Sequence, residues 1–130
     1  MHTDQSVELK SMDEQNFAED IYSRASAIDP SRSFCLCAPA GSGKTEILIQ
    51  RFLALLGRAS KPRNILAITF TRKAAAEMKE RVISALLFAK EERIINSSHQ
   101  NRTNVLAQNV LARSSTLNWD ILSDDSLLNI

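Results

Sequence analysis

The residues best suited to chemistry in this sequence form the run Ala38-Pro39-Ala40-Gly41-Ser42-Gly43-Lys44-Thr45. Its last three residues fit the phosphate-loop pattern G-x-x-x-x-G-K-[ST], although Ala38 stands where the first glycine is expected. Gly41 and Gly43 can adopt backbone angles that turn successive N–H groups inward around an anion. A helix expected to begin at about Lys44 would add its free N–H groups and its dipole.

We therefore predict that the whole run from Ala38 to Thr45 binds ATP together with Mg²⁺. Lys44 would reach the β- and γ-phosphates and offset charge that builds during phosphoryl transfer, and the Thr45 hydroxyl would bind Mg²⁺. Lys44 and Thr45 are accordingly the predicted catalytic residues, with Thr45 as the metal ligand. The alternative is a chance Gly-Ser-Gly-Lys turn, but an apolar segment, the loop and an amphipathic helix follow one another in the expected order.

The segments around the loop predict an α/β fold with parallel strands flanked by helices. Short apolar runs at 34–37 and 65–69 are expected to be strands that are buried on both faces. Pro30 ends the first helix, because proline disfavours the α conformation of the preceding residue. Apolar spacing predicts three helices, over 12–28, from about Lys44 to near Gly57, and over 72–93.

The last part of the chain has a different pattern. The polar run 96–101 is expected to be a linker, and apolar residues over 105–111 and 117–122 indicate two short helices. We therefore divide the chain into a nucleotide-binding part, residues 1–95, and a helical segment, residues 96–130.

Length and composition set limits on these predictions. With 130 residues and 44% apolar content the chain forms one domain at most. No apolar run approaches a membrane span and the N-terminus lacks signal-peptide features, so we expect a cytoplasmic protein without a membrane partner. Cys35 and Cys37 have no other Cys or His at metal-ligand spacing, and we interpret them as reduced thiols packed in a core strand.

The charge is unevenly distributed although the net charge is only +1. The first thirty residues are acidic, whereas the stretch from Arg51 to Arg93 holds ten basic residues (Arg51, Arg58, Lys61, Arg63, Arg72, Lys73, Lys79, Arg81, Lys90 and Arg93). These residues form either solvated helix faces or a surface for a phosphate backbone. Charge alone favours the solvated faces.

Two motifs together resemble the UvrD/Rep-like superfamily 1 DNA helicases. The loop is similar to the family's A-x-A-G-S-G-K-T, and residues 65–82 look like the block usually written T-F-T-N-K-A-A-x-E-M. The stretch after Asp29 is most similar to the RecB/AddA-type helicase-nuclease branch. The resemblance implies that 1–95 is the N-terminal part of a RecA-like P-loop NTPase domain and 96–130 a truncated helical insertion. It also implies an ATP-dependent helicase that acts on single-stranded DNA in repair or recombination.

The second motif implies a DNA contact through Thr69, Phe70, Thr71, Arg72 and Lys73. An exposed aromatic side chain can stack on a base of any sequence, which contributes about 1–3 kcal/mol per base. Residues at the start of a helix are suited to hold backbone phosphate. The alternative for Phe70 is packing against the sheet, because aromatic side chains often belong to the core.

The sequence departs from the family pattern at two places. Arg72 replaces the asparagine of T-F-T-N-K, which keeps a hydrogen-bond donor and adds a charge. The family's adenine-reading glutamine falls on Ser23 when counted without gaps, whereas the nearest upstream glutamine is Gln15. Ser23 and Gln15 are therefore both candidates for the adenine contact.

A working helicase of this family also needs an Asp-Glu pair and arginines from a second RecA-like domain, and neither is found in this sequence. We therefore expect the chain to be part of a larger protein, with the remainder of the helicase as its partner, and to be inactive in ATP hydrolysis alone. An uncovered sheet edge would allow self-association. The alternatives are a non-catalytic nucleotide- or DNA-binding remnant, or a different P-loop enzyme such as a small kinase.

Overall fold

The computed structural model describes residues 4–39, 41, 43–92, 94–95 and 97–130, with side chains described from Glu14 onward. This part of the chain forms four α-helices: α1 (Asp4–Ile28), α2 (Lys44–Leu56), α3 (Arg72–Lys90) and α4 (Ser98–Leu117). Two 3-10 helices, η1 (Pro62–Asn64) and η2 (Asp125–Leu127), lie in the connections. None of the described helices combines the length and apolarity needed to span a membrane.

The predicted α/β fold class is wrong, because the described residues form helices and no β-strand. Residues 34–37 have no regular secondary structure and are exposed, and they take part in no ladder with another described segment. Residues 65–69 form a single parallel bridge, in which the Ala67 N–H donates to the Asn129 carbonyl at 3.0 Å. A strand is stabilised by hydrogen bonds to a neighbour, so an apolar pattern without that neighbour gives extended chain and not a sheet.

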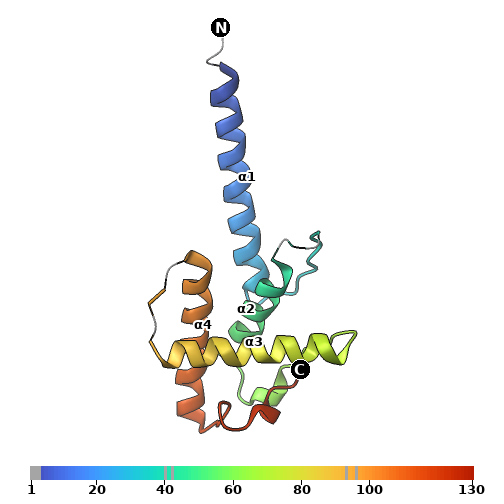
Figure 1. Ribbon diagram of the computed structural model, residues 1–130, viewed down its shortest axis with the longest axis vertical. Helices are drawn as coiled ribbons and strands as arrows, with labels where there is room; N and C mark the ends of the chain where they lie inside the picture. The colour runs from blue at the N-terminus through green and yellow to red at the C-terminus, as the bar shows by residue number, and fades with distance from the viewer. Residues whose placement is uncertain (1–3, 40, 42, 93, 96) are drawn as a thin grey trace.

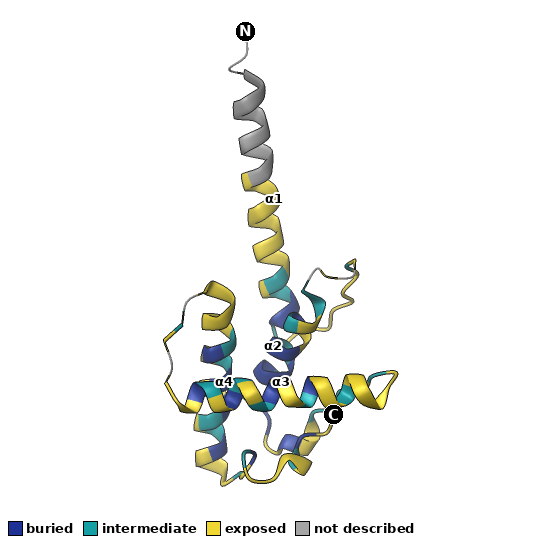
Figure 2. Ribbon diagram, in the orientation of Figure 1, coloured by how far each residue is buried: buried dark blue, intermediate teal, exposed yellow. Residues whose placement is uncertain are grey.

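The hydrophobic core lies where α2, α3 and α4 meet, and each of these helices carries dark blue, buried segments there in Figure 2. Helical spacing places one apolar stripe of each helix against the others. The largest fully buried side chains are Leu53, Leu56, Val82, Leu86 and Val110. This core fixes the direction of α2, which begins at the predicted phosphate loop.

Helix α1 stands apart from this core over most of its length (Figure 1). Residues 14–23 are exposed, and only its last turn is buried, with Ala27 and Ile28 packed with Ile47 and Ala54. The predicted helix over 12–28 is therefore confirmed at its C-terminal end but begins earlier, at Asp4. Its orientation depends on the few contacts at that last turn.

The predictions for α2 and α3 are confirmed, whereas the prediction for the last segment is wrong. In place of a linker and two short helices, Ser98–Leu117 is one continuous helix. Ser97 starts it, because the Ser97 hydroxyl oxygen accepts from the Gln100 N–H at 3.2 Å. Asn118, with φ +55°, ends it in the left-handed conformation that asparagine tolerates.

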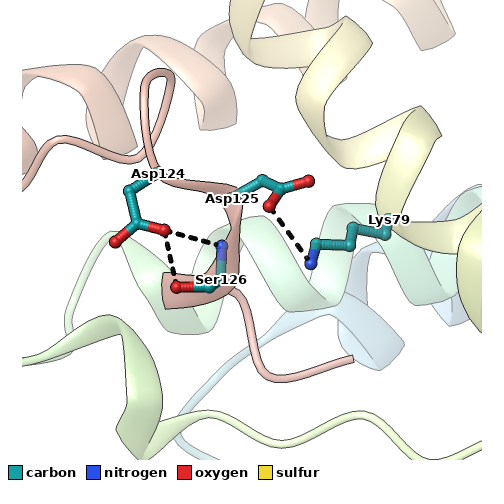
Figure 3. A network of polar contacts seen from close by, with 4 residues as sticks. All are labelled: Lys79, Asp124, Asp125 and Ser126. Carbon is teal, nitrogen blue, oxygen red and sulfur yellow. Dashed lines mark hydrogen bonds and ion pairs between the residues drawn. The ribbon is translucent and has the colours of Figure 1, made fainter.

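The C-terminal segment folds back onto α3 (Figure 3). Asp124 accepts hydrogen bonds from the Ser126 hydroxyl at 2.5 Å and the Ser126 N–H at 3.1 Å, and these bonds lower the pKa of the Asp124 carboxyl. The Asp125 carboxylate lies 3.7 Å from the Lys79 ammonium of α3. Leu128, which follows, is buried in the core.

Candidate functional site

The two glycines of the predicted phosphate loop have left-handed backbone conformations. Gly41 and Gly43 have φ of +79° and +86°, backbone angles that residues other than glycine adopt only with strain. Helix α2 begins at Lys44 with Gly43 as its N-cap, and its first intrahelical bond runs from the Ile47 N–H to the Gly43 carbonyl. The N–H groups before Ile47 have no intrahelical partner and are available to an anion.

The other loop residues surround this turn. Lys44 is half-buried and Thr45 exposed, while Ala38 is half-buried and Pro39 exposed. Ala40 and Ser42 of the predicted site lie outside the described residues. The assignment of the run to ATP and Mg²⁺ stays a prediction.

Glu46, the acidic residue in the first turn of α2, is hydrogen-bonded to α4. The Thr103 hydroxyl donates to the Glu46 carboxylate at 2.6 Å and accepts from the buried Gln50 amide at 2.9 Å. Glu46 is therefore engaged with α4 (Ser98–Leu117). Lys44 is the charged residue that begins the helix at the loop.

Arg51 of α2 connects the end of α1 to the segment that leads into the loop. Its guanidinium donates to the Ala27 and Asp29 carbonyls at 2.9 Å each and to the Arg32 carbonyl at 2.6 Å. The same group lies 5.7 Å from the centre of the Phe34 ring, within cation–π range. Sequence analysis placed Arg51 only among the basic residues, and its partners are backbone atoms that carry no side-chain pattern.

The turn after α1 is closed by its own side chains. Asp29 accepts from the Ser31 hydroxyl at 2.6 Å and from the Ser31 N–H at 2.9 Å, and these bonds lower the pKa of the Asp29 carboxyl. Further along, Cys35 and Cys37 are free and exposed, with their sulfur atoms 4.0 Å apart. The prediction of thiols packed in a core strand is therefore wrong, because residues 34–37 pair with no neighbour among the described residues.

A second residue that sequence analysis missed is Arg24 of α1. Its guanidinium lies beside Gly43, since a Cβ added at Gly43 would be 3.0 Å from the Arg24 Nη1 atom. Of the two adenine candidates, Ser23 lines a cavity of about 350 Å³ that Phe34 and Cys35 also line. Gln15 is exposed on the part of α1 that stands clear of the core.

The predicted DNA-binding residues surround the start of α3. Thr71 is the N-cap, and its hydroxyl oxygen accepts from the Ala74 N–H at 3.0 Å. The Thr69 hydroxyl donates to the Thr71 carbonyl, also at 3.0 Å, which closes the turn on which Phe70 stands. Phe70, Arg72 and Lys73 are all exposed. A role in DNA binding stays a prediction for all five residues.

The comparison with sequence families assigns the class of protein. Residues 20–130 match the family described as the UvrD/REP helicase N-terminal domain. The chain therefore belongs to the UvrD/REP helicase family and corresponds to an N-terminal region of these proteins.

Individual relatives agree with the family. The ATP-dependent DNA helicase PcrA of Bacillus subtilis (strain 168) is 40% identical over 96 residues, which are 73% of this chain and 13% of that protein. The ATP-dependent DNA helicase Rep of Buchnera aphidicola subsp. Acyrthosiphon pisum is 32% identical over 106 residues, 79% of this chain and 16% of that protein. The chain thus spans less than a fifth of the length of either relative. No solved structure matches the chain at a significant level.

The loop geometry predicts opposite effects for two glycine substitutions. Gly43→Ala places a Cβ at φ +86° and 3.0 Å from the Arg24 guanidinium. We expect it to lower the free energy of unfolding by about 1–2 kcal/mol in urea denaturation, because of the left-handed conformation.

Gly57→Ala is the matched control at the other end of α2. Gly57 has φ −61°, and its Cβ would be 3.5 Å from the Leu53 carbonyl, an ordinary contact. We expect it to raise stability by about 0.4–1 kcal/mol, since alanine restricts the unfolded chain. Equal stability of the two variants would contradict the left-handed loop geometry.

Proposed function

We propose that this chain is the ATP-binding portion of an ATP-dependent DNA helicase or translocase that acts on single-stranded DNA. The observation that carries the proposal is the pair of left-handed glycines, Gly41 and Gly43, directly before the first turn of α2. Membership of the UvrD/REP family supports it, as does the description of the PcrA and Rep relatives as ATP-dependent DNA helicases. A role in DNA repair or recombination follows from the same proposal.

In this proposal the loop holds the phosphates and the rest of a longer protein completes the chemistry. The free N–H groups at the start of α2 bind phosphate oxygens, and Lys44 offsets their charge. Thr45 is the Mg²⁺ ligand, but the described residues contain no group of three or more His, Cys, Asp or Glu that could hold a metal ion. The chain therefore binds ATP, and hydrolysis needs carboxylates and arginines from outside it.

The DNA contact is proposed at the turn before α3. Phe70 is fully exposed on a turn fixed by the Thr69 and Thr71 hydrogen bonds, which suits stacking on a base. Arg72 and Lys73 follow in the first turn of α3, where N–H groups and positive side chains both attract phosphate. Four further expectations remain predictions from the sequence. They are the domain boundary at residue 95, membership of the RecB/AddA-type branch, a cytoplasmic location and self-association of the chain.

Lys44→Ala tests the nucleotide site. We expect the affinity of the chain for Mg²⁺-ATP, measured by calorimetric titration, to fall about tenfold or more, because a charge-assisted contact is lost. In a longer protein that contains this chain, the same change should abolish ATP turnover and leave DNA binding largely intact. Lys61→Ala removes an exposed lysine in another loop and is the matched control.

Two outcomes would contradict the nucleotide site. Unchanged ATP affinity in Lys44→Ala would show that the loop does not bind ATP. Normal ATP turnover by the Lys44→Ala variant of the longer protein would show the same. DNA-stimulated hydrolysis by the 130-residue chain itself would show that it contains a catalytic carboxylate, against the proposal.

Phe70→Ala tests the DNA contact. We expect the affinity for labelled single-stranded oligothymidine, measured by fluorescence anisotropy, to fall about tenfold, since one base–aromatic stack contributes about 1–3 kcal/mol. Ile68→Ala is the control, because Ile68 is also exposed and apolar but cannot stack. An equal loss in both variants would contradict a stacking role for Phe70.

A further inference from the structure

Cys35 and Cys37, the two cysteines of the sequence, form a close pair of thiols. Both are free and exposed, and their sulfur atoms lie 4.0 Å apart. A disulfide bond is about 2.05 Å long, so the two sulfur atoms need to approach each other by about 2 Å to form one. The pair lies directly before Ala38, the first residue of the predicted phosphate loop.

The backbone of this segment has few restraints against that approach. Residues 34–37 have no regular secondary structure and take part in no ladder with another described segment. The contacts of Arg51 lie before the pair, since its guanidinium donates to the Arg32 carbonyl at 2.6 Å and lies 5.7 Å from the centre of the Phe34 ring. A segment without ladder hydrogen bonds can change its backbone angles at low cost, so the two sulfur atoms can meet.

The two thiols differ in their surroundings. Cys35 lines a cavity of about 350 Å³ that Arg32 and Phe34 also line, whereas Cys37 does not line it. The guanidinium groups of Arg32 and Arg51 lie 5.4 Å and 5.7 Å from the centre of the Phe34 ring. Positive groups beside a cavity raise the local concentration of small anions, so a small anionic reagent reaches Cys35 before Cys37.

We propose that Cys35 and Cys37 are a dithiol site, which a small anionic disulfide of the class of oxidised glutathione converts into an intramolecular disulfide. The Cys35 thiolate attacks one sulfur atom of the reagent, a mixed disulfide forms, and the first glutathione leaves as a thiolate. The Cys37 thiolate then attacks the Cys35 sulfur atom, and the second glutathione leaves. Two cysteine thiols are oxidised, the reagent is reduced to two thiols, and the two cysteine protons pass to the glutathione thiolates.

The new bond is reversible. Exposed disulfides are reduced more readily than buried structural ones, and this class includes the regulatory disulfides. Excess reduced glutathione therefore returns Cys35 and Cys37 to thiols by the same two steps in reverse. The site goes beyond the proposed nucleotide and DNA contacts and does not depend on either of them.

The test incubates the reduced chain with oxidised glutathione, blocks the remaining thiols with N-ethylmaleimide at set times, and measures the intact mass. We expect the original chain to lose two hydrogen atoms and to carry neither glutathione nor maleimide. Cys37→Ser should stop at one glutathione adduct on Cys35, because the second attack is no longer possible. Cys35→Ser should gain its adduct about tenfold more slowly, because Cys37 lies outside the cavity.

Arg32→Gln, combined with Cys37→Ser, tests the role of the cavity. We expect it to slow the reaction with oxidised glutathione several-fold and to leave the reaction with bis(hydroxyethyl) disulfide unchanged, because only the first reagent is anionic. Arg81→Gln in the same background is the matched control, since Arg81 is exposed on α3 (Arg72–Lys90) and does not line the cavity. If Arg32→Gln slows neither reaction, the inference of an anionic reagent is wrong.

Three further outcomes would overturn the proposal. Two glutathione adducts on the original chain, or a disulfide-linked dimer, would show that the two thiols do not pair within one chain. Oxidation of the unfolded chain in urea at the same rate as the folded chain would show that the structure does not bring the thiols together.

Discussion

The arrangement of the candidate site depends on one guanidinium, that of Arg51, which binds three backbone carbonyls from 27 to 32. The last carbonyls of a helix have no intrahelical partner, and leaving such a group buried without a hydrogen bond costs about 1–3 kcal/mol. Of the three, the Ala27 carbonyl belongs to the last turn of α1, and the Asp29 and Arg32 carbonyls follow the helix. Arg51 reaches all three from α2 (Lys44–Leu56), about two turns after the loop lysine. It therefore fixes the end of α1, the turn at Asp29 and the segment leading to the loop relative to the helix that follows the loop.

Helix α2 belongs to the hydrophobic core and also begins at the candidate site. Its apolar stripe, with Leu53 and Leu56 fully buried, packs with α3 and α4, and its first residue lies at the glycine loop. Packing at one end thus determines where the free N–H groups point at the other. The Thr103 bond to Glu46 ties the first turn to α4 in the same way. The loop is thus positioned by a core built mainly from α2, α3 and α4, to which Ile121 and Leu128 of the C-terminal segment also belong.

Sequence predicted the helices and the loop much better than the sheet. Periodicity located α2 and α3 because their apolar stripes are buried by each other, and the loop pattern located glycines that adopt positive φ. The predictions of strands at 34–37 and 65–69 were wrong, because a strand needs a neighbouring strand to pair with and its own apolar pattern does not specify one. The Ser97 cap starts α4 inside the run predicted as a linker, and Asn118 ends it before the second predicted helix, 117–122. Arg51 was missed because its partners are backbone carbonyls that lie about twenty residues earlier in the sequence.

The central claim is that a phosphate anion is bound by the backbone at the start of α2. The most direct measurement is a titration of the isotopically labelled chain with Mg²⁺-ATP, followed through its backbone amide NMR signals. The account predicts saturable shifts at Gly43, Lys44 and Thr45, with the amides of α4 (Ser98–Leu117) unaffected at the same concentrations. Unchanged signals at those three residues, or shifts of equal size throughout the chain, would contradict it.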